Sequence, residues 1–308
     1  MKIYDMIVLG GGPAGYTAAM YAVRAGLSAL VIEKVAAGGQ MTETAAIDNY
    51  PGFEDGVDGY TLGGKMKAQA EKFGAESVNA EVREVFLMDK VKRIVTEDSE
   101  YLSKTVVAAT GAHHRKLGLR HEEELIGRGV GYCAECDGMF YKGKNVAVVG
   151  GGNSAAADAL ALSRIANSVT LIHRRDSLRA SKVYHEPLIN AENVHLLLSS
   201  EATEFVFEDK LTGVYVKDKI TGEERMLPLD GLFISIGRSP ETDMFKGQLA
   251  LDDNGYLQAG EDTRTSVPGV FAAGDVRTKA LRQIITAAAD GASAAHFAEE
   301  YLADAGGF

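Results

Sequence analysis

The sequence predicts an α/β fold that contains two copies of one strand–turn–helix unit. Several short stretches are almost entirely apolar, which is typical of parallel strands covered on both faces. Two of them run into a glycine-rich turn and then into a segment whose apolar residues have helical spacing. The turns begin at Gly10 and Gly150, 140 positions apart, so the unit is repeated within the chain.

The first copy begins with the predicted strand Asp5–Leu9 and continues through GGGPAG into a predicted helix that stops at Gly26. A strand, the pattern G-x-G-x-x-G and a helix, in this order, indicate a dinucleotide-binding turn. Gly10 allows the tight turn, and Gly12 lets the backbone approach a pyrophosphate that faces the helix N-terminus. Gly15 lets the helix sit close to the strand.

An acidic residue completes this first copy. The next predicted strand, Ser28–Ile32, ends at Glu33, which follows Gly15 by 18 positions. A carboxylate at this place can accept hydrogen bonds from a ribose diol but would repel a 2′-phosphate. The first copy therefore indicates a dinucleotide without that phosphate.

The second copy ends differently. Its predicted strand Asn145–Val149 leads through GGGNSA into a predicted helix, Ala156–Ala166, and the next strand is Val169–Ile172. Four basic residues follow that strand: His173, Arg174, Arg175 and Arg179. His173 lies 18 positions after the turn, as Glu33 does in the first copy. Arginines here suit the 2′-phosphate of NADP, and the alternative is a solvated basic loop.

The segments between the two copies contain further strands and loops. Gly38–Gln40 and Ile47–Gly52 carry glycine and proline and are predicted as irregular surface segments. Lys65–Phe73 is predicted as an amphipathic helix and Ala80–Asp98 as strands of a meander. Thr105–Ala109 is a buried strand that ends in Thr110 and Gly111, where a strand end would meet a ligand.

The only two cysteines form one Cys-x-x-Cys, Cys133 and Cys136, with Asp137 directly behind. Two sulfurs this close can cycle between dithiol and disulfide. A zinc site would need two more ligands, which no second cysteine pair or nearby histidine pair supplies. The motif alone is also compatible with chance spacing or with half of an intermolecular metal site.

The C-terminal part repeats the theme of strands that end in glycine. Leu227–Ile236 with Gly237 and Arg238 ends the second copy as Thr110 and Gly111 end the first. Val270–Asp275 is a predicted strand that delivers an aspartate at a glycine turn. A long predicted helix, Leu281–Leu302, follows.

Composition argues against several function classes. The formal net charge of −11 argues against nucleic acid or an anionic membrane surface as a partner. No apolar run approaches the ~18 residues of a membrane span. The chain enters its first strand at once, so we expect no signal peptide, and two cysteines leave no disulfide framework. A length of 308 residues suits two domains, and we expect a cytoplasmic protein.

Together the motifs resemble the low-molecular-weight thioredoxin reductases of bacteria and related flavoproteins. The resemblance spans nearly the whole chain, in the order GGGPAG, GGQ with NYPG, ATGA, CxxCDG, GGGNSA, HRRDSLR, VFAAGDV and RQI. It implies two Rossmann-like dinucleotide-binding domains of the three-layer ββα type. Residues 1–112 and 241–308 would form an FAD domain, into which residues 113–240 are inserted as an NADPH domain that carries the disulfide.

The resemblance also implies site residues. The expected FAD contacts are Gly10, Gly12, Pro13, Ala14, Gly15, Glu33, Gly39, Gln40, Asn49, Thr110, Gly111, Gly274, Asp275, Arg282, Gln283 and Ile284. The expected NADPH contacts are Gly150, Gly152, Asn153, Ser154, His173, Arg174, Arg175, Arg179, Ile236, Gly237 and Arg238. The helix that begins near Arg282 would aim its dipole at the flavin, although plain core packing is its alternative.

The implied reaction passes electrons from NADPH through FAD and the Cys133–Cys136 disulfide to thioredoxin. Asp137 matches the proton-transfer acid of the family, and a helix cap is its alternative role. The partner would be held by a docking loop and by apolar side chains, which are matched by Arg128, Gly129, Met139 and Phe140. A homodimer is implied as well, in which the NADPH domain rotates relative to the FAD domain.

Three departures from the family pattern bear on the partner and on the thiols. Met139 replaces a common Phe, and Ala157–Asp158 stand where two adjacent acids are frequent. Glu135 stands between the cysteines in place of Thr or Val. We expect its charge to repel a neighbouring thiolate and so to slow thiol attack at neutral pH.

Two other functions compete with this interpretation. A protein with the same architecture could use another acceptor, as a dithiol oxidase that consumes O₂ or as a reductase for a peroxidase or glutaredoxin-like protein. From another class, the chain could be a nucleotide-dependent redox sensor that binds a partner without turnover. A sensor would need the redox cycle to be blocked, and no element of the cycle is missing from the motifs.

Overall fold

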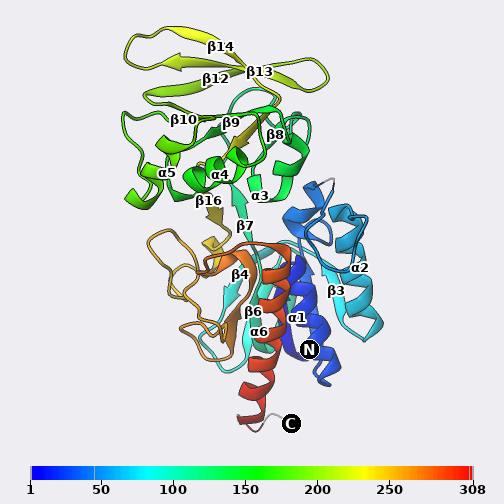
Figure 1. The fold of residues 1–308 in the computed structure, drawn as a ribbon. Coiled ribbons are helices and arrows are strands. Elements are labelled where there is room, and N and C mark those ends of the chain that lie inside the picture. The colour runs from blue at the N-terminus through cyan, green and yellow to red at the C-terminus, as the bar shows by residue number, and fades with distance from the viewer. Residues whose placement is uncertain (1, 45, 305, 307–308) are drawn as a thin grey trace. The chain divides into compact units, whose positions relative to one another are not determined.

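The computed structural model describes residues 2–44, 46–304 and 306, and the chain divides into two units (Figure 1). The first unit joins Met1–His113 to Ser239–Phe308, and the second is the continuous segment His114–Arg238. The chain therefore crosses between the units twice. The crossing segments form a two-stranded sheet of β7 (Ala112–His114) and β16 (Arg238–Pro240).

The sheet of the first unit is built from both chain segments. Its strand order is β3-β2-β1-β6-β5-β4, and β17 pairs in parallel with β6. The strands are β1 (Ile3–Leu9), β2 (Ala29–Glu33), β3 (Glu76–Asn79), β4 (Val82–Phe86), β5 (Lys92–Thr96), β6 (Glu100–Ala108) and β17 (Val270–Ala272). β1, β2, β3 and β6 run parallel, whereas β4, β5 and β6 form an antiparallel meander.

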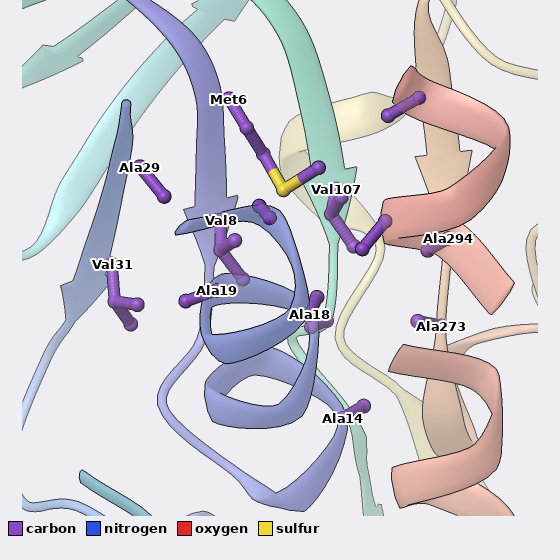
Figure 2. Packing of buried hydrophobic residues seen from close by; sticks show 14 of the residues in the cluster. Met6, Val8, Ala14, Ala18, Ala19, Ala29, Val31, Val107, Ala273 and Ala294 are labelled. Atoms are coloured by element: carbon purple, nitrogen blue, oxygen red, sulfur yellow. The ribbon is translucent and has the colours of Figure 1, made fainter. Parts of the chain in front are cut away.

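Among the described residues, three α-helices belong to this unit: α1 (Pro13–Arg24), α2 (Gly59–Lys72) and α6 (Ile284–Asp304). Figure 2 shows β1 side chains, such as Met6 and Val8, facing the alanines of α1 and α6 in one core. Small residues allow α1 and α6 to approach closely, since a Cβ on Gly291 would lie 2.2 Å from the carbonyl oxygen of Ala14. This packing places the first turn of α1 against α6.

The second unit has three layers. A five-stranded parallel sheet, in the order β11-β10-β9-β15-β8, lies between helices and an antiparallel sheet of β12, β13 and β14. The parallel strands are β8 (Val130–Gly131), β9 (Asn145–Val149), β10 (Ser168–Ile172), β11 (Val194–Leu197) and β15 (Gly231–Ile234). The antiparallel strands are β12 (Ser200–Phe207), β13 (Leu211–Asp218) and β14 (Glu224–Pro228).

The two faces of the parallel sheet have separate cores. Val146 and Val148 of β9 pack with the helices α3 (Ala134–Asp137), α4 (Asn153–Ser163) and α5 (His185–Asn190). Val149 packs on the other side with residues of the antiparallel sheet. The predicted α/β class with Rossmann-like, three-layer architecture is therefore confirmed.

Short 3₁₀ turns complete the described elements: η1 (Gly39–Glu43), η2 (Gly138–Tyr141), η3 (Lys182–Tyr184), η4 (Asp243–Phe245) and η5 (Gly274–Val276). Helix ends differ most from the sequence predictions. The helix predicted for Lys65–Phe73 begins at Gly59, because the Asp58 carboxylate caps it by accepting from the Thr61 N–H at 2.8 Å. Within the described residues, no helix is long and apolar enough to cross a membrane.

Candidate functional site

Cys133 and Cys136 form a disulfide in the second unit, with their Cα atoms 5.2 Å apart. The Cys136 N–H donates to the Cys133 sulfur at 3.2 Å and to the Cys133 carbonyl, also at 3.2 Å. A donor aimed at this sulfur favours the thiolate once the bond is reduced. In the part of the chain that the structure describes, no cluster of His, Cys, Asp and Glu could hold a metal ion.

Asp137 lies directly behind the disulfide, at the end of α3. Its carboxylate packs against Gly131, where a Cβ would lie 3.3 Å from Oδ2. Burial raises the pKa of Asp137 to about 6. A carboxyl group with such a pKa can hold and release a proton near neutral pH. The alternative role as a cap finds no support among the described residues, because the Asp137 side chain makes no capping hydrogen bond to η2.

Glu135 belongs to a charged group that also includes residues of α4 and β16. Burial raises the pKa of Asp158, although the hydrogen bond that the Ser235 hydroxyl donates to its carboxylate lowers that pKa. The charge of Glu135 raises the same pKa further, and Arg238 lowers it. Glu135, a departure from the family pattern, is therefore electrostatically linked to Asp158, the acid that remains beside Ala157, within one unit.

The first glycine turn has the geometry that its fingerprint predicts. Gly10 has φ +107°, and a Cβ on Gly15 would lie 1.9 Å from the carbonyl oxygen of Gly10, so neither position tolerates a side chain. A Cβ on Gly12 would meet its nearest described atom only at 3.9 Å. Pro13 begins α1, where its missing N–H costs nothing. The backbone at Gly12 is thus open to a ligand such as a pyrophosphate.

Other predicted contact residues gather around this turn. The Gly38 N–H donates to Gly11 at 2.8 Å, and the Gly39 backbone lies beside Gly12. Gly274 of η5 packs against Ala14, since a Cβ there would lie 3.0 Å from the Ala14 Cβ. Segments from both parts of the first unit therefore meet at the start of α1.

Hydrogen bonds also hold Asn49, Gln283, Thr110 and Gly111, four further predicted residues of the first unit. The Asn49 amide donates to the Gln283 side-chain oxygen at 3.2 Å, which links the NYPG segment to the start of α6. The Thr110 hydroxyl donates to the Glu241 carbonyl at 2.6 Å, and the Glu241 N–H donates to Gly111 at 3.0 Å.

The Glu33 carboxylate lies beside the first glycine turn and also stabilises it. Its Oε2 accepts from the Gly11 N–H at 2.6 Å, and its Oε1 accepts from the Val35 N–H at 3.0 Å. Each carboxylate oxygen has more than one lone pair, so these bonds leave acceptor capacity for a ribose hydroxyl. Hydrogen bonds from backbone N–H groups therefore hold the Glu33 carboxylate beside the turn.

The second glycine turn is similarly open. A Cβ on Gly152 would meet no atom of the described residues within 4 Å, whereas a Cβ on Gly150 would lie 2.3 Å from the Ser235 carbonyl oxygen. The basic segment is tied to this turn. Arg179 N–H donates to Gly151 at 2.7 Å, and the Asn153 side chain accepts from the Ser181 N–H at 2.7 Å.

His173 does not share the surroundings of the arginines. Arg174, Arg175 and Arg179 are exposed, but the His173 side chain is only 6% exposed. Its ring lies under Gly151, where a Cβ would approach ring atoms to 2.2 Å, and its Nε2 finds no hydrogen-bond partner among the described residues. Burial lowers the pKa of His173, and the nearby arginines lower it further. The basic surface is therefore formed by the three arginines, whereas the buried His173 is neutral.

Ile236 and Gly237, two further predicted residues of the second copy, follow Ser235, which lies beside the second turn. The Ser235 N–H donates to Val149 at 2.8 Å, and the Arg115 N–H donates to Gly237 at 3.0 Å. Ile236 packs against the core of the antiparallel-sheet side.

Two buried acids were not predicted as functional, Glu122 and Asp290. Glu122 begins a run of three glutamates, a pattern that is typical of a solvated surface. An aspartate between the alanine-rich segments 287–289 and 292–295 of α6 was the available signal for Asp290.

Comparison with known proteins agrees with this arrangement. The profile of the family described as pyridine nucleotide-disulphide oxidoreductase matches residues 4–291. Thioredoxin reductases from Streptomyces clavuligerus and Listeria monocytogenes are 49% and 45% identical, and each alignment covers 98% of this chain and 94% of the relative. The crystal structure of a thioredoxin reductase from Streptococcus pyogenes superposes with a TM-score of 0.93 at 42% identity, covering 98% of this chain and 99% of that one.

Flavin oxidoreductases with a redox-active disulfide make up this family, and the cysteine pair found here is such a disulfide. The matches extend over nearly the whole chain rather than over one glycine turn. The chain therefore belongs to the pyridine nucleotide-disulphide oxidoreductase family, in its low-molecular-weight thioredoxin reductase branch.

Proposed function

We propose that the chain uses NADPH to reduce the disulfide of thioredoxin or of a thioredoxin-like protein, through FAD and the Cys133–Cys136 disulfide. The observation that carries this proposal is the closed disulfide beside Asp137, on the same unit as a glycine turn flanked by arginines. The relatives that share this arrangement are thioredoxin reductases.

FAD suits the first unit. The open backbone at Gly12 and the N-terminus of α1 would receive a pyrophosphate, and Glu33 would accept from a ribose. Asp275, together with the Asn49–Gln283 pair, would supply polar contacts near the start of α6. Bound there, FAD would supply the chemistry that turns a hydride from NADPH into two electrons for a disulfide.

NADPH suits the second unit. The open backbone at Gly152 and the N-terminus of α4 match a pyrophosphate in the same way as the first turn. Arg174, Arg175 and Arg179 would bind the 2′-phosphate through charge-assisted hydrogen bonds. His173 would be neutral and would pack against Gly151 of the second turn, so it would add no charge to the phosphate site.

The protein's own residues would then complete the transfer. Two electrons and two protons convert the disulfide into two thiols, and one thiolate attacks the disulfide of the partner to form a mixed disulfide. The second thiolate resolves it, and the partner leaves as a dithiol. Asp137, with its pKa of about 6, would give and take the protons that these steps require.

The partner would dock beside the cysteines. Met139 and Phe140 follow the disulfide in η2, and their side chains are 65% and 49% exposed. Exposed apolar side chains next to a redox centre support docking of another protein. Arg128, on the loop that precedes the cysteines, would contribute a charged contact.

The proposal extends to assembly and location. A homodimer is proposed from the family resemblance, and Tyr21, Tyr60 and Ile285 supply exposed apolar surface on the first unit. A cytoplasmic location is proposed because the chain has no cysteines other than the redox pair. Light scattering of the purified protein would give twice the chain mass for a dimer and the chain mass for a monomer.

NADPH oxidation with a panel of acceptors tests the function. We expect the purified protein to contain FAD, to oxidise NADPH rapidly when thioredoxin is present, and to consume little O₂. An oxidation rate that follows O₂ uptake and ignores thioredoxin would contradict the proposal and favour a dithiol oxidase. Faster turnover with a glutaredoxin-like or peroxidase acceptor would favour the alternative that the substitutions at Glu135 and Met139 suggest. Binding without turnover would favour a sensor.

A further inference from the structure

Glu122 is a buried carboxylate in the second unit that the redox steps do not use. Its side chain is 3% exposed, although it begins the run of acidic residues 122–124. Four neutral donors reach it: Leu117 N–H at 3.0 Å, Gly118 N–H at 2.8 Å, Leu119 N–H at 3.3 Å and the Tyr132 hydroxyl at 2.6 Å. A buried carboxylate requires such donors, because it has lost its hydration.

These donors come from the two ends of one loop. Leu117, Gly118 and Leu119 lie shortly after β7, and Tyr132 follows β8 directly. One carboxylate therefore joins the beginning of the loop to its end. The end is also held by the parallel sheet, since the Leu232 N–H donates to Gly129 at 2.7 Å.

Tyr132 is held from two sides and immediately precedes Cys133. Its hydroxyl is bound by Glu122, and its ring stacks on His114 with centroids 4.8 Å apart and planes at 19°. Cys133 follows as the N-cap of α3, which carries Cys136. The direction in which the backbone enters the disulfide is therefore fixed by a chain of contacts from Glu122 through Tyr132.

We propose that Glu122, acting through Tyr132, is a positioning residue for the Cys133–Cys136 pair. When two electrons and two protons open the disulfide, the bond between the sulfurs no longer holds them together, and the surrounding fold must do so. A rigid entry at Tyr132 keeps the thiols close, which favours closure of the disulfide. A more stable disulfide has a lower reduction potential, and its dithiol form is the stronger reductant.

The inference rests on the redox role of the disulfide and is tested by its equilibrium rather than by turnover. The full-length, FAD-loaded protein is equilibrated in buffers of increasing dithiothreitol-to-disulfide ratio, alkylated, and analysed by mass for closed and open Cys133–Cys136. The variants are Tyr132→Phe, which removes only the hydroxyl, and Glu122→Gln, which puts an amide donor among four donors. Glu123→Gln is the matched control, because Glu123 is an exposed neighbour on the same loop.

We expect Tyr132→Phe to open at a dithiothreitol ratio about tenfold lower than the wild type, which corresponds to about 30 mV for a two-electron couple. Glu122→Gln should shift at least as far, and Glu123→Gln should not shift. Wild-type midpoints in both Tyr132→Phe and Glu122→Gln would overturn the inference and leave Glu122 as a brace of the loop alone.

If Glu122→Gln does not fold, the midpoint of Tyr132→Phe decides. Failure of the wild type to reduce thioredoxin would count against the proposed function but would leave this equilibrium measurement intact. The two proposals can therefore fail separately.

Discussion

Asp137 places an ionisable group directly behind the disulfide, and its burial raises its pKa to about 6. Burial disfavours the charged carboxylate, so the folded protein keeps the proton to higher pH than the unfolded chain does. Between about pH 4 and pH 6 the unfolded state therefore binds fewer protons, and the stability of the fold decreases as pH rises through this window. We therefore expect Asp137 to lower the stability of the fold at neutral pH while it provides a group for proton transfer.

Replacement of Asp137 by Asn separates these two effects. The amide is isosteric and has no charge to bury, so the free energy of unfolding at pH 7 should rise by on the order of 2 kcal/mol relative to wild type. Thioredoxin reduction should fall by about 10²-fold or more, because a general acid and base is lost. Urea unfolding at pH 4 and pH 7, beside steady-state rates, provides the measurement. Equal stability differences at the two pH values would contradict this account of Asp137.

At the scale of elements, the two glycine turns share a geometry and differ in the residue beneath them. Glu33 accepts from the Gly11 N–H in one copy, and His173 packs under Gly151 in the other. The interval of 18 positions predicted that Glu33 and His173 would occupy equivalent positions in the two copies. It could not predict that His173 would be buried and the arginines exposed, because that depends on how the chain beyond β10 folds back onto Gly151.

The arginines after β10 should select NADPH over NADH. Each charge-assisted bond to the 2′-phosphate contributes roughly 1.5–3 kcal/mol, so replacing Arg174, Arg175 and Arg179 by Ala should raise the KM for NADPH at least a hundredfold. The KM for NADH should change little. Initial rates with both nucleotides provide the test, with Arg164→Ala, an exposed arginine at the end of α4, as control. A triple variant that still prefers NADPH would show that the arginines form only a solvated loop.

α6 is fixed to the Gly274–Val276 turn by a buried ion cluster. The Asp290 carboxylate accepts from Gly274 N–H at 2.9 Å, from two nitrogens of Arg277 at 2.9 and 2.7 Å, and from Lys279 at 2.8 Å. Burial works against the charged form of Asp290, but the bonds from Arg277, Lys279 and Gly274 outweigh it and hold its pKa below the usual value. The cluster therefore stabilises the unit above about pH 4 and loses that contribution as pH falls further.

Asp290→Ala should lower the free energy of unfolding by about 3–5 kcal/mol, because it leaves Arg277 buried without its carboxylate. The loss should be visible as a lower urea midpoint at pH 7 and should shrink as the pH is lowered below about 4, because the wild-type carboxylate is then progressively protonated and its contribution is lost. Asp304→Asn, at the exposed end of α6, is the control. A wild-type midpoint for Asp290→Ala at pH 7 would show that the cluster contributes nothing net.

Local patterns predicted the strands and the glycine turns well, and long-range contacts limited the rest. β1, β9 and both turns follow from apolar runs and glycine spacing. The start of α2 was missed because the Asp58 cap lies outside the amphipathic pattern. The burial of Glu122 was not predictable, since its donors include Tyr132, ten residues along the chain and next to the cysteines.

The whole molecule consists of one unit inserted into another, each with its own cores. The internal repeat predicted two nucleotide turns. It did not predict that β17, from the last part of the chain, would pair with β6 and bring η5 and α6 to the first turn. The segments around the first glycine turn therefore come together only when both chain segments of the first unit are present. The disulfide belongs to the other unit, together with the arginine-flanked turn.

The central claim is that electrons from NADPH reach thioredoxin only through the Cys133–Cys136 disulfide. Cys133→Ser and Cys136→Ser test it most directly, by rapid mixing with NADPH followed by thioredoxin. We expect NADPH to bleach the flavin absorbance of both variants, because that step comes before the disulfide. We expect neither variant to reduce thioredoxin, because a single thiol cannot complete the exchange. Substantial turnover with thioredoxin in both single variants would contradict the account.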